Sequence, residues 1–264
     1  MSHEEERIRR SVLLTIAYDG HAFHGFAPQP GVRTVAGTLL TAVQTIDPQV
    51  ELLRGASRTD AGVHARGQLV AFDTTKTIAP KGWALGINQA LPVDVAVVRA
   101  ALVGAGFNPR FANVQKTYLY EIHLSPLRDP WKQHRAWWVQ PPLDVERMKR
   151  EAKSLVGTHN FAAFRSAADT RENTVRTIFC VSVDVASQRV SVAVTGAGFM
   201  HNMVRIIVGT LVDVGRGRLA EGAVARALAS GDRTSGGMTA PPDGLLLDGI
   251  ALDPSVTLDE SWPF

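Results

Sequence analysis

Residues 55–66 read GASRTDAGVHAR and lie between two strand-like segments, 50–57 and 68–75. This short stretch holds a basic residue, an acid, a glycine and a histidine, and its central group is Asp60. Asp followed by a small residue and Gly is frequent in turns, because Asp hydrogen-bonds its own backbone and Gly tolerates a positive φ. Taken alone, the string therefore favours a turn acid over a catalytic one.

The two strands around Asp60 are the middle of a longer pattern in the first half of the chain. Apolar runs predict strands, and helical spacing with cap residues predicts helices. In order, we expect a strand over 11–19, a helix over 34–46, strands over 50–57 and 68–75, a helix from 80, and a strand over 95–103. This order, β-α-β-β-α-β, is that of the split βαβ, ferredoxin-like unit.

The second half repeats the order with additions. We expect strands over 116–125 and 134–140, a helix over 144–156, a hairpin of 174–186 and 189–195, helices over 199–214 and 220–230, and a strand over 245–252. The fold class predicted is α+β: two ferredoxin-like (split βαβ) units with a continuous antiparallel sheet and a central cleft. Residues 1–106 form the N-terminal unit with the Asp60 loop, and residues 107–264 form the C-terminal unit with an extra strand and helix. A continuous sheet would remove two exposed edges.

Composition places the chain among ordinary globular proteins. It has 264 residues, of which 45% are hydrophobic and 20% charged, and a single cysteine, Cys180. One cysteine permits neither an internal disulfide nor a zinc site of several thiolates. No apolar run is long enough to cross a bilayer, and the charged start MSHEEERIRR lacks the apolar core of a signal peptide. We expect a cytoplasmic protein without a membrane partner.

The basic excess is small, with a formal net charge of +3 and a pI near 9.2. Such an excess is a weak pointer to nucleic acid. Several arginines nevertheless fall in loops or at element ends, where a fork-shaped guanidinium suits a phosphate. They are Arg58, Arg66, Arg110, Arg165, Arg176 and Arg205. Ordinary solvated charges explain them equally well at this point.

Most common chemistries find no support in the motifs. Neither GxGxxG after a strand nor GxxxxGK[ST] is present, so a nucleotide cofactor is not expected, and the histidines do not form a metal-binding pattern. Ser57 lies near His64 but outside any GxSxG motif. What remains is a loop acid, arginines and two strand tyrosines, Tyr118 and Tyr120. This set suits an enzyme that acts on an extruded base, although alternation puts both tyrosines on one face and does not choose between them.

Beyond these features, the chain resembles the TruA family of tRNA pseudouridine synthases over nearly its whole length. The most specific segments are RTDAGVH at 58–64 and MVRIIVG at 203–209. The others are YDG at 18–20, RTVAGTL at 33–39, LGINQALPVDVAV at 85–97, FNPRF at 107–111, KTYLYEI at 116–122, NFAAFR at 160–165 and TAPPDGLLL at 239–247. Departures occur at Phe26, where many relatives have Trp, at Ala27-Pro28-Gln29, at Ser57 and at Leu246; they bear on tRNA selectivity.

The resemblance implies isomerisation of uridines 38, 39 and 40 of the tRNA anticodon stem-loop to pseudouridine, without cofactor or metal, by a homodimer. It also implies roles for individual residues. Asp60 would be the nucleophile, Arg205 its ion-pair partner, Arg58 the residue that helps flip the nucleotide, Tyr118 the ring that stacks on the base, and Leu245 the cover of the pocket. Arg66, Arg110 and Arg165 are candidate phosphate contacts.

Two alternatives stay open at this point. A non-catalytic RNA-binding module would use the same arginines and tyrosines, with Asp60 as a turn residue, since ferredoxin-like sheets often bind RNA. A glycosylase would use Asp60 to expel a base. The set of Arg58, Asp60 and Arg205 argues against a pure binding module, which would have no use for it.

Overall fold

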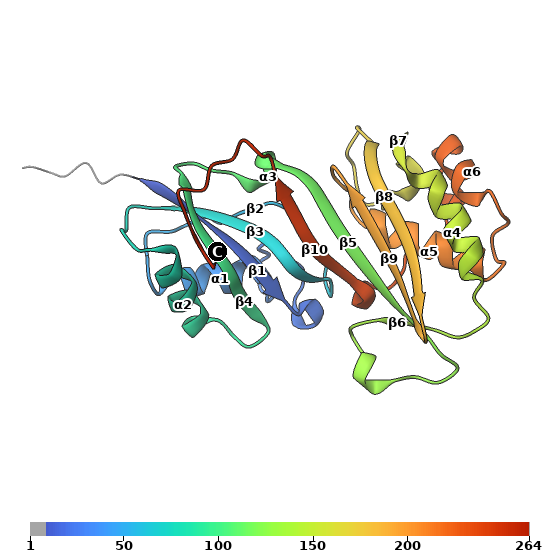
Figure 1. Ribbon diagram of the computed structural model, residues 1–264, viewed down its shortest axis with the longest axis horizontal. Helices are drawn as coiled ribbons and strands as arrows, with labels where there is room; N and C mark the ends of the chain where they lie inside the picture. The colour runs from blue at the N-terminus through green and yellow to red at the C-terminus, as the bar shows by residue number, and fades with distance from the viewer. Residues whose placement is uncertain (1–8, 264) are drawn as a thin grey trace, which may run out of the picture. The chain divides into compact units, whose positions relative to one another are not determined.

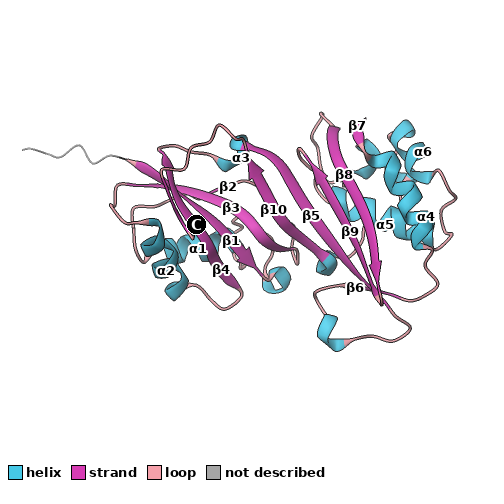
Figure 2. Cartoon of the chain, viewed as in Figure 1, coloured by secondary structure: helices cyan, strands magenta, loops and turns pink. Residues whose placement is uncertain are grey.

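The chain folds into two compact units, each of mixed α and β structure (Figures 1 and 2). The computed structural model describes residues 9–263; the charged residues 1–8 used above, and Phe264, lie outside the described residues. Unit 1 comprises the chain up to residue 114 together with the part from 250 onward, and unit 2 comprises residues 115–249. In the described part, no helix is long and apolar enough to span a membrane. The α+β class is confirmed.

Unit 1 has the strand order of a ferredoxin-like unit. Its elements are β1 (Arg10–Tyr18), η1 (Gly20–Ala22), α1 (Val35–Gln44), β2 (Arg54–Gly55), β3 (His64–Thr74), α2 (Pro80–Ala90), β4 (Val95–Gly104), α3 (Pro109–Ala112) and β11 (Glu260–Trp262). The strands are ordered β11-β4-β1-β3, with β2 also paired to β3. The antiparallel pairing of β1 with both β3 and β4 is that of the split βαβ arrangement.

Local sequence signals account for the helix starts in unit 1. Thr34 caps α1 by accepting a hydrogen bond from the amide of Gly37, and Pro80 occupies the first turn of α2, where no amide donor is needed. The strand expected over 50–57 is wrong in extent, since regular pairing with β3 covers only Arg54–Gly55, and Ala56 adds one amide bond to the carbonyl of Leu69. Beyond them, the side-chain amide of Gln68 bonds both the N–H and the carbonyl of Ser57. A side chain thus replaces the ladder there.

Both faces of the unit 1 sheet are covered. On the helical face, the fully buried rings of Phe72 and Trp83 meet edge to face with centroids 5.2 Å apart. Burial of side chains of this size stabilises a fold by roughly 1.5–3 kcal/mol each. The opposite face holds a smaller cluster around Leu13 and Leu69, against which Ile250 and Leu252 pack. This cluster, with β11 on β4, ties the end of the chain to unit 1, whereas the sequence placed all of 107–264 in the second unit.

Asp73 joins three parts of unit 1 through hydrogen bonds. Its lowered pKa predicts how the stability of the fold depends on acid pH. Its carboxylate accepts hydrogen bonds from the Arg54 guanidinium at 2.7 and 3.1 Å, from the Ser11 hydroxyl, and from the Gly106 amide at 3.0 Å. Burial alone would raise its pKa, but these donors outweigh burial and lower the pKa to about 2 from 3.8. The carboxylate's stabilisation is therefore fully present above about pH 4 and is lost as pH falls through about 2.

We expect Asp73→Asn to lower the free energy of unfolding at pH 7 by about 2 kcal/mol, at 1.36 kcal/mol per pKa unit. The variant should also lose less stability than wild type between pH 4 and pH 2. Urea unfolding across this range measures both effects, with Asp259→Asn, an exposed acid of the same unit, as the control. Equal acid sensitivity of wild type and Asp73→Asn would contradict the assignment.

Unit 2 repeats the order of unit 1. Its elements are β5 (Asn113–Leu124), η2 (Pro130–Lys132), β6 (Trp137–Val139), α4 (Val145–Ala152), η3 (Lys153–Leu155), β7 (Gly157–Asn160), η4 (Ala162–Phe164), β8 (Val175–Ala186), β9 (Arg189–Gly196), α5 (Met203–Gly215), α6 (Ala223–Ser230), η5 (Arg233–Ser235), η6 (Pro242–Gly244) and β10 (Leu245–Leu252). The strand order is β10-β5-β9-β8-β7, with β6 parallel to β5. Counted in chain order, β10-β5-β9-β8 is the 4-1-3-2 order of β4-β1-β3-β2.

The α-helices of unit 2, α4, α5 and α6, lie together beside β7, β8 and β9 (Figure 2), with α4 in contact with β8, α5 and α6. The helix expected from Phe199 begins only at Met203, because Asn202 has a φ of 60° and starts the helix from a left-handed turn. Likewise α6 begins at Ala223, after Gly222 with a φ of 80°. Strand β10 runs from unit 2 into unit 1, since the boundary falls between Gly249 and Ile250. The continuous sheet and the central cleft stay predictions.

Candidate active site

The Asp60 loop joins β2 to β3 and is fixed by hydrogen bonds on both sides of the acid. The buried hydroxyl of Thr59 lies 2.7 Å from that of Tyr18, and the carbonyl of Thr59 accepts from the amide of Phe26 at 3.0 Å. The carbonyl of Asp60 accepts from the amide of Val63 at 3.2 Å, which closes a turn. Asp60 itself is half-buried. The loop thus presents a carboxyl group from a backbone that its neighbours hold in place.

The segment after β1 forms a cradle for this loop. A Cβ on Gly20 would overlap the carbonyl oxygen of Val63, so only glycine allows the two backbones to approach so closely. The amide of Gly20 donates to Nδ1 of His64 at 3.0 Å, and Oδ1 of Asp19 lies 3.1 Å from the same nitrogen. Gly25, with a φ of +90°, packs against the backbone of Thr59. The YDG segment (18–20) and the RTDAGVH segment (58–64) therefore pack against each other.

The remaining candidate residues of unit 1 are cations on its surface. Arg58 precedes the buried Thr59 and is exposed, and Arg66 is exposed on β3. Arg110 is exposed in α3, whose first turn is capped by Asn108 through its side-chain oxygen. Exposed guanidinium groups of this kind suit phosphate oxygens, with which they form paired hydrogen bonds.

Arg205 and Leu245 are two of the expected site residues that lie in unit 2. In the guanidinium of Arg205, Nε donates to the carbonyl of Ala240 at 2.8 Å, and Nη1 donates to Oδ1 of Asn202 at 2.7 Å. These bonds fix the plane of a half-buried cation near the start of α5. Leu245, the first residue of β10, is buried at 5% exposure.

The structure separates the two strand tyrosines of β5 by their partners. Tyr120 is fully buried, and its hydroxyl donates to the carbonyl of Pro241 at 2.7 Å. Burial raises the pKa of Tyr120 far above its ordinary value, against the opposing effect of the Arg205 cation. Tyr118 packs edge to face on Phe199, with ring centroids 5.2 Å apart. Both rings are buried, Tyr118 at 6% exposure, and their partners differ; the role of Tyr118 stays a prediction.

Asp169 is an anchoring residue that no motif indicated. Its carboxylate accepts from the side chain of Arg171 and from the amide of His201, the latter at 3.1 Å. The Arg171 hydrogen bond, against the cost of burial, lowers the pKa of Asp169 well below its usual range. Arg165 donates to the carbonyl of Arg171, so the segment that carries this candidate phosphate contact is tied to the turn before α5. The sequence offered no signal for this because Asp169 and His201 are 32 positions apart.

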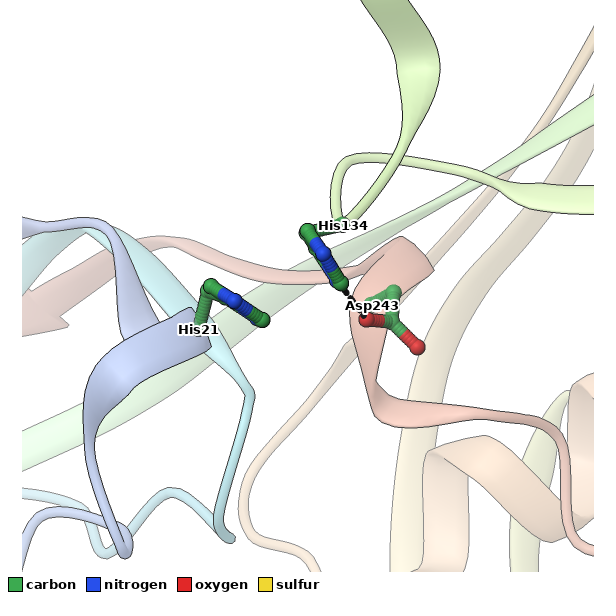
Figure 3. Close-up of side chains that lie close together, drawn as sticks. All are labelled: His21, His134 and Asp243. Carbon is green, nitrogen blue, oxygen red and sulfur yellow. Dashed lines mark hydrogen bonds and ion pairs between the residues drawn. The ribbon is translucent and has the colours of Figure 1, made fainter. Parts of the chain in front are cut away.

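One histidine–carboxylate pair also lies in unit 2. Nδ1 of His134 is 3.1 Å from Oδ1 of Asp243 (Figure 3). Figure 3 also draws His21, which belongs to η1 of unit 1 and is exposed. The absence of a metal and of a cofactor stays a prediction.

Comparison with known proteins decides the family. A family model described as tRNA pseudouridine synthase matches residues 152–250. Over 245 residues the chain is 40% identical to the "tRNA pseudouridine synthase A" of Bacillus velezensis, covering 92% of this chain and 99% of that protein. The chain belongs to the TruA family of tRNA pseudouridine synthases. The same name is carried by a Bacillus subtilis relative, 39% identical with 90% and 98% covered, and by one of Shouchella clausii, 42% identical with 88% and 89% covered. A match of this length includes both units, so the TruA resemblance is confirmed over nearly the whole chain.

Proposed function

We propose that the protein isomerises uridines 38, 39 and 40 of the tRNA anticodon stem-loop to pseudouridine. The observation that carries the proposal is the 40% identity to a tRNA pseudouridine synthase A over 92% of the chain. The geometry of unit 1 supports it, because a single acid stands in a loop whose backbone is fixed on both sides. No cofactor or metal enters the reaction.

The reaction moves one bond within the nucleotide. The N1–C1′ bond breaks, a C5–C1′ bond forms, the proton on C5 leaves and N1 gains a proton, so substrate and product have equal mass. The ionised carboxylate of Asp60 starts the sequence, either by attacking C1′ or by removing the C2′ proton to give a glycal. Both routes free the uracil to rotate. The target nucleotide must leave the stack for Asp60 to reach its sugar.

Unit 2 supplies the other groups in this proposal. Arg205 pairs with Asp60 in the complex and orients its carboxylate through charge-assisted hydrogen bonds. The bonds from Arg205 to Ala240 and Asn202 orient the guanidinium for that role. Tyr118 stacks on the uracil and Leu245 covers it. Asp60 belongs to unit 1, and these groups belong to unit 2.

Substrate tRNA binds through phosphates in this proposal. Arg58 helps extrude the nucleotide, and Arg66, Arg110 and Arg165 contact the backbone. Binding led by phosphates releases counterions, so affinity should fall steeply as salt rises. We also propose a homodimer in which one tRNA touches both subunits, and a cytoplasmic location. Light scattering of the purified protein tests the dimer directly.

A position-resolved pseudouridine assay tests the function. Unmodified tRNA transcripts with uridine at only one of positions 38, 39 or 40 are incubated with wild-type protein, and each position is read separately. Conversion at these positions, with no change in strand mass and no free uracil, is the expected result. Release of uracil would instead indicate a glycosylase, and tight binding without conversion on any transcript would indicate a binding module.

A further inference from the structure

The segment between β5 and β6, residues 126–136 with sequence PLRDPWKQHRA, carries an exposed tryptophan. We call it the 126–136 finger. Trp131 is 92% exposed and Leu127 is 75% exposed. Trp is usually buried to a large degree, so a fully presented indole on a surface segment commonly marks a contact site. None of the site residues predicted from the sequence lies in this segment, which does include His134, the partner of Asp243.

Hydrogen bonds hold the finger in a defined shape. At its base, the amide of Ser125 donates to Val139 at 3.1 Å, and Nε1 of Trp138 donates to the carbonyl of Ser125 at 2.8 Å. At its tip, the carboxylate of Asp129 accepts from the amide of Trp131 at 3.0 Å and caps η2. Trp131 is thus presented to solvent by an ordered turn.

The charges of the finger favour an anionic partner. Three cationic side chains, Arg128, Lys132 and Arg135, stand against one acid, Asp129, whose carboxylate already caps η2. The guanidinium of Arg128 lies over the ring of Trp138, 5.0 Å from its centroid. An exposed indole among cations is the combination that binds unpaired bases in RNA: the ring stacks on the base and the cations meet its phosphates.

The finger is also connected to the candidate site of unit 2. His134, near its C-terminal end, has a φ of 60° and pairs with Asp243 (Figure 3). Asp243 belongs to η6, the turn that leads directly into Leu245. Gly244 of this turn packs so closely on the ring of Tyr120 that a Cβ would meet it at 2.6 Å. The finger is therefore connected through Asp243 and η6 to Tyr120 and Leu245.

We propose that the 126–136 finger is a second RNA-contacting element, in which Trp131 stacks on an unpaired base of the substrate and Lys132 and Arg135 contact its phosphates. This inference rests on the proposed function, because it takes tRNA as the ligand. A second copy of the chain is the competing occupant. RNA is favoured because the finger carries three cationic side chains and one acid, and a self-complementary contact between two copies would place those like charges against each other.

The test compares Trp131→Ala, Trp131→Phe and Leu127→Ala with wild type. Affinity for an unmodified tRNA transcript is measured by filter binding at fixed salt, and conversion is measured at limiting and at saturating tRNA. We expect Trp131→Ala to weaken binding about tenfold, the scale of one lost base–aromatic stack. Trp131→Phe should recover most of the affinity, Leu127→Ala should bind as wild type, and the rate at saturating tRNA should change less than about threefold.

Fluorescence supplies an independent readout. Acrylamide should quench the Trp131 signal, taken as the difference between wild type and Trp131→Phe, less strongly when tRNA is bound. Wild-type affinity in Trp131→Ala, or equal losses in Leu127→Ala, would overturn the proposal. So would a change of oligomeric state in Trp131→Ala by light scattering, which would assign the finger to a second copy. Failure of the proposed function is distinct, because wild type would then convert no uridine whatever the finger binds.

Discussion

Asp60→Ala should bind tRNA as wild type does and form no measurable pseudouridine. Loss of an enzyme's nucleophile commonly lowers the rate by more than about 10⁴-fold, because no neighbouring group supplies the same covalent or proton-transfer step. Binding should survive because phosphate contacts by cations carry most of the affinity for nucleic acid. The fold should survive as well, since the loop is held by Thr59, Phe26 and Val63 through contacts that do not use the Asp60 side chain.

The measurement is single-turnover conversion of a transcript with one target uridine, together with its dissociation constant. Asp60→Asn removes the charge and keeps the shape, and it should be as inactive as Asp60→Ala. Glu51→Ala, which removes an exposed acid of the same unit, serves as the matched control and should keep full activity. Normal conversion by folded Asp60→Ala would rule out Asp60 as the nucleophile, and the protein would then need another reactive group.

Much of the fold was predictable because its signals are local. The Thr34 cap, the proline at the start of α2 and the apolar strand 10–18 each depend on a few neighbouring residues. Their order is sufficient to indicate the ferredoxin-like arrangement of unit 1. The same was true of the hairpin in unit 2, where Ser187 takes a φ of 56° between β8 and β9.

What the sequence did not predict depends on contacts between distant residues. The end of the chain returns to unit 1 because Ile250 and Leu252 pack on a cluster that includes Leu13. The sequence near residue 250 does not indicate this contact. The start of α5 depends in the same way on a left-handed residue, Asn202, inside an otherwise apolar run. The apolar run begins at Phe199, so its periodicity predicts a helix start four residues before Met203.

The candidate site shows the same division. The sequence pointed to Asp60 as a loop acid, but alternation on β5 left Tyr118 and Tyr120 equivalent. The bond from Tyr120 to Pro241 distinguishes them, and it joins residues 121 positions apart. The close approach of Gly20 to Val63 also joins distant residues. A glycine in a Gly/Pro-rich loop can serve a turn or a close contact, and the sequence does not distinguish these roles.

Gly20→Ala tests whether that close approach positions the acid. The φ of Gly20 lies outside the left-handed region, so alanine can adopt the backbone conformation there, and the whole effect comes from contact with Val63. The added Cβ would overlap the Val63 carbonyl, and a backbone group cannot turn aside as a flexible side chain does. Overpacking of this kind typically lowers stability by about 1–3 kcal/mol. Because Val63 donates to the carbonyl of Asp60, its displacement also moves the acid.

We therefore expect Gly20→Ala to lower the melting temperature and to lower the conversion rate about a hundredfold, the scale of a misplacement of about 1 Å. The rate is measured well below the variant's melting temperature, with tRNA saturating, so that unfolding and weak binding do not contribute. Gly104→Ala is the matched control: no atom lies within 4 Å of its Cβ, and it should change neither property. A Gly20→Ala protein that is less stable yet fully active would show that the cradle after β1 only supports the fold. Loss of rate in a folded, tRNA-saturated variant would show that this cradle sets the position from which Asp60 acts.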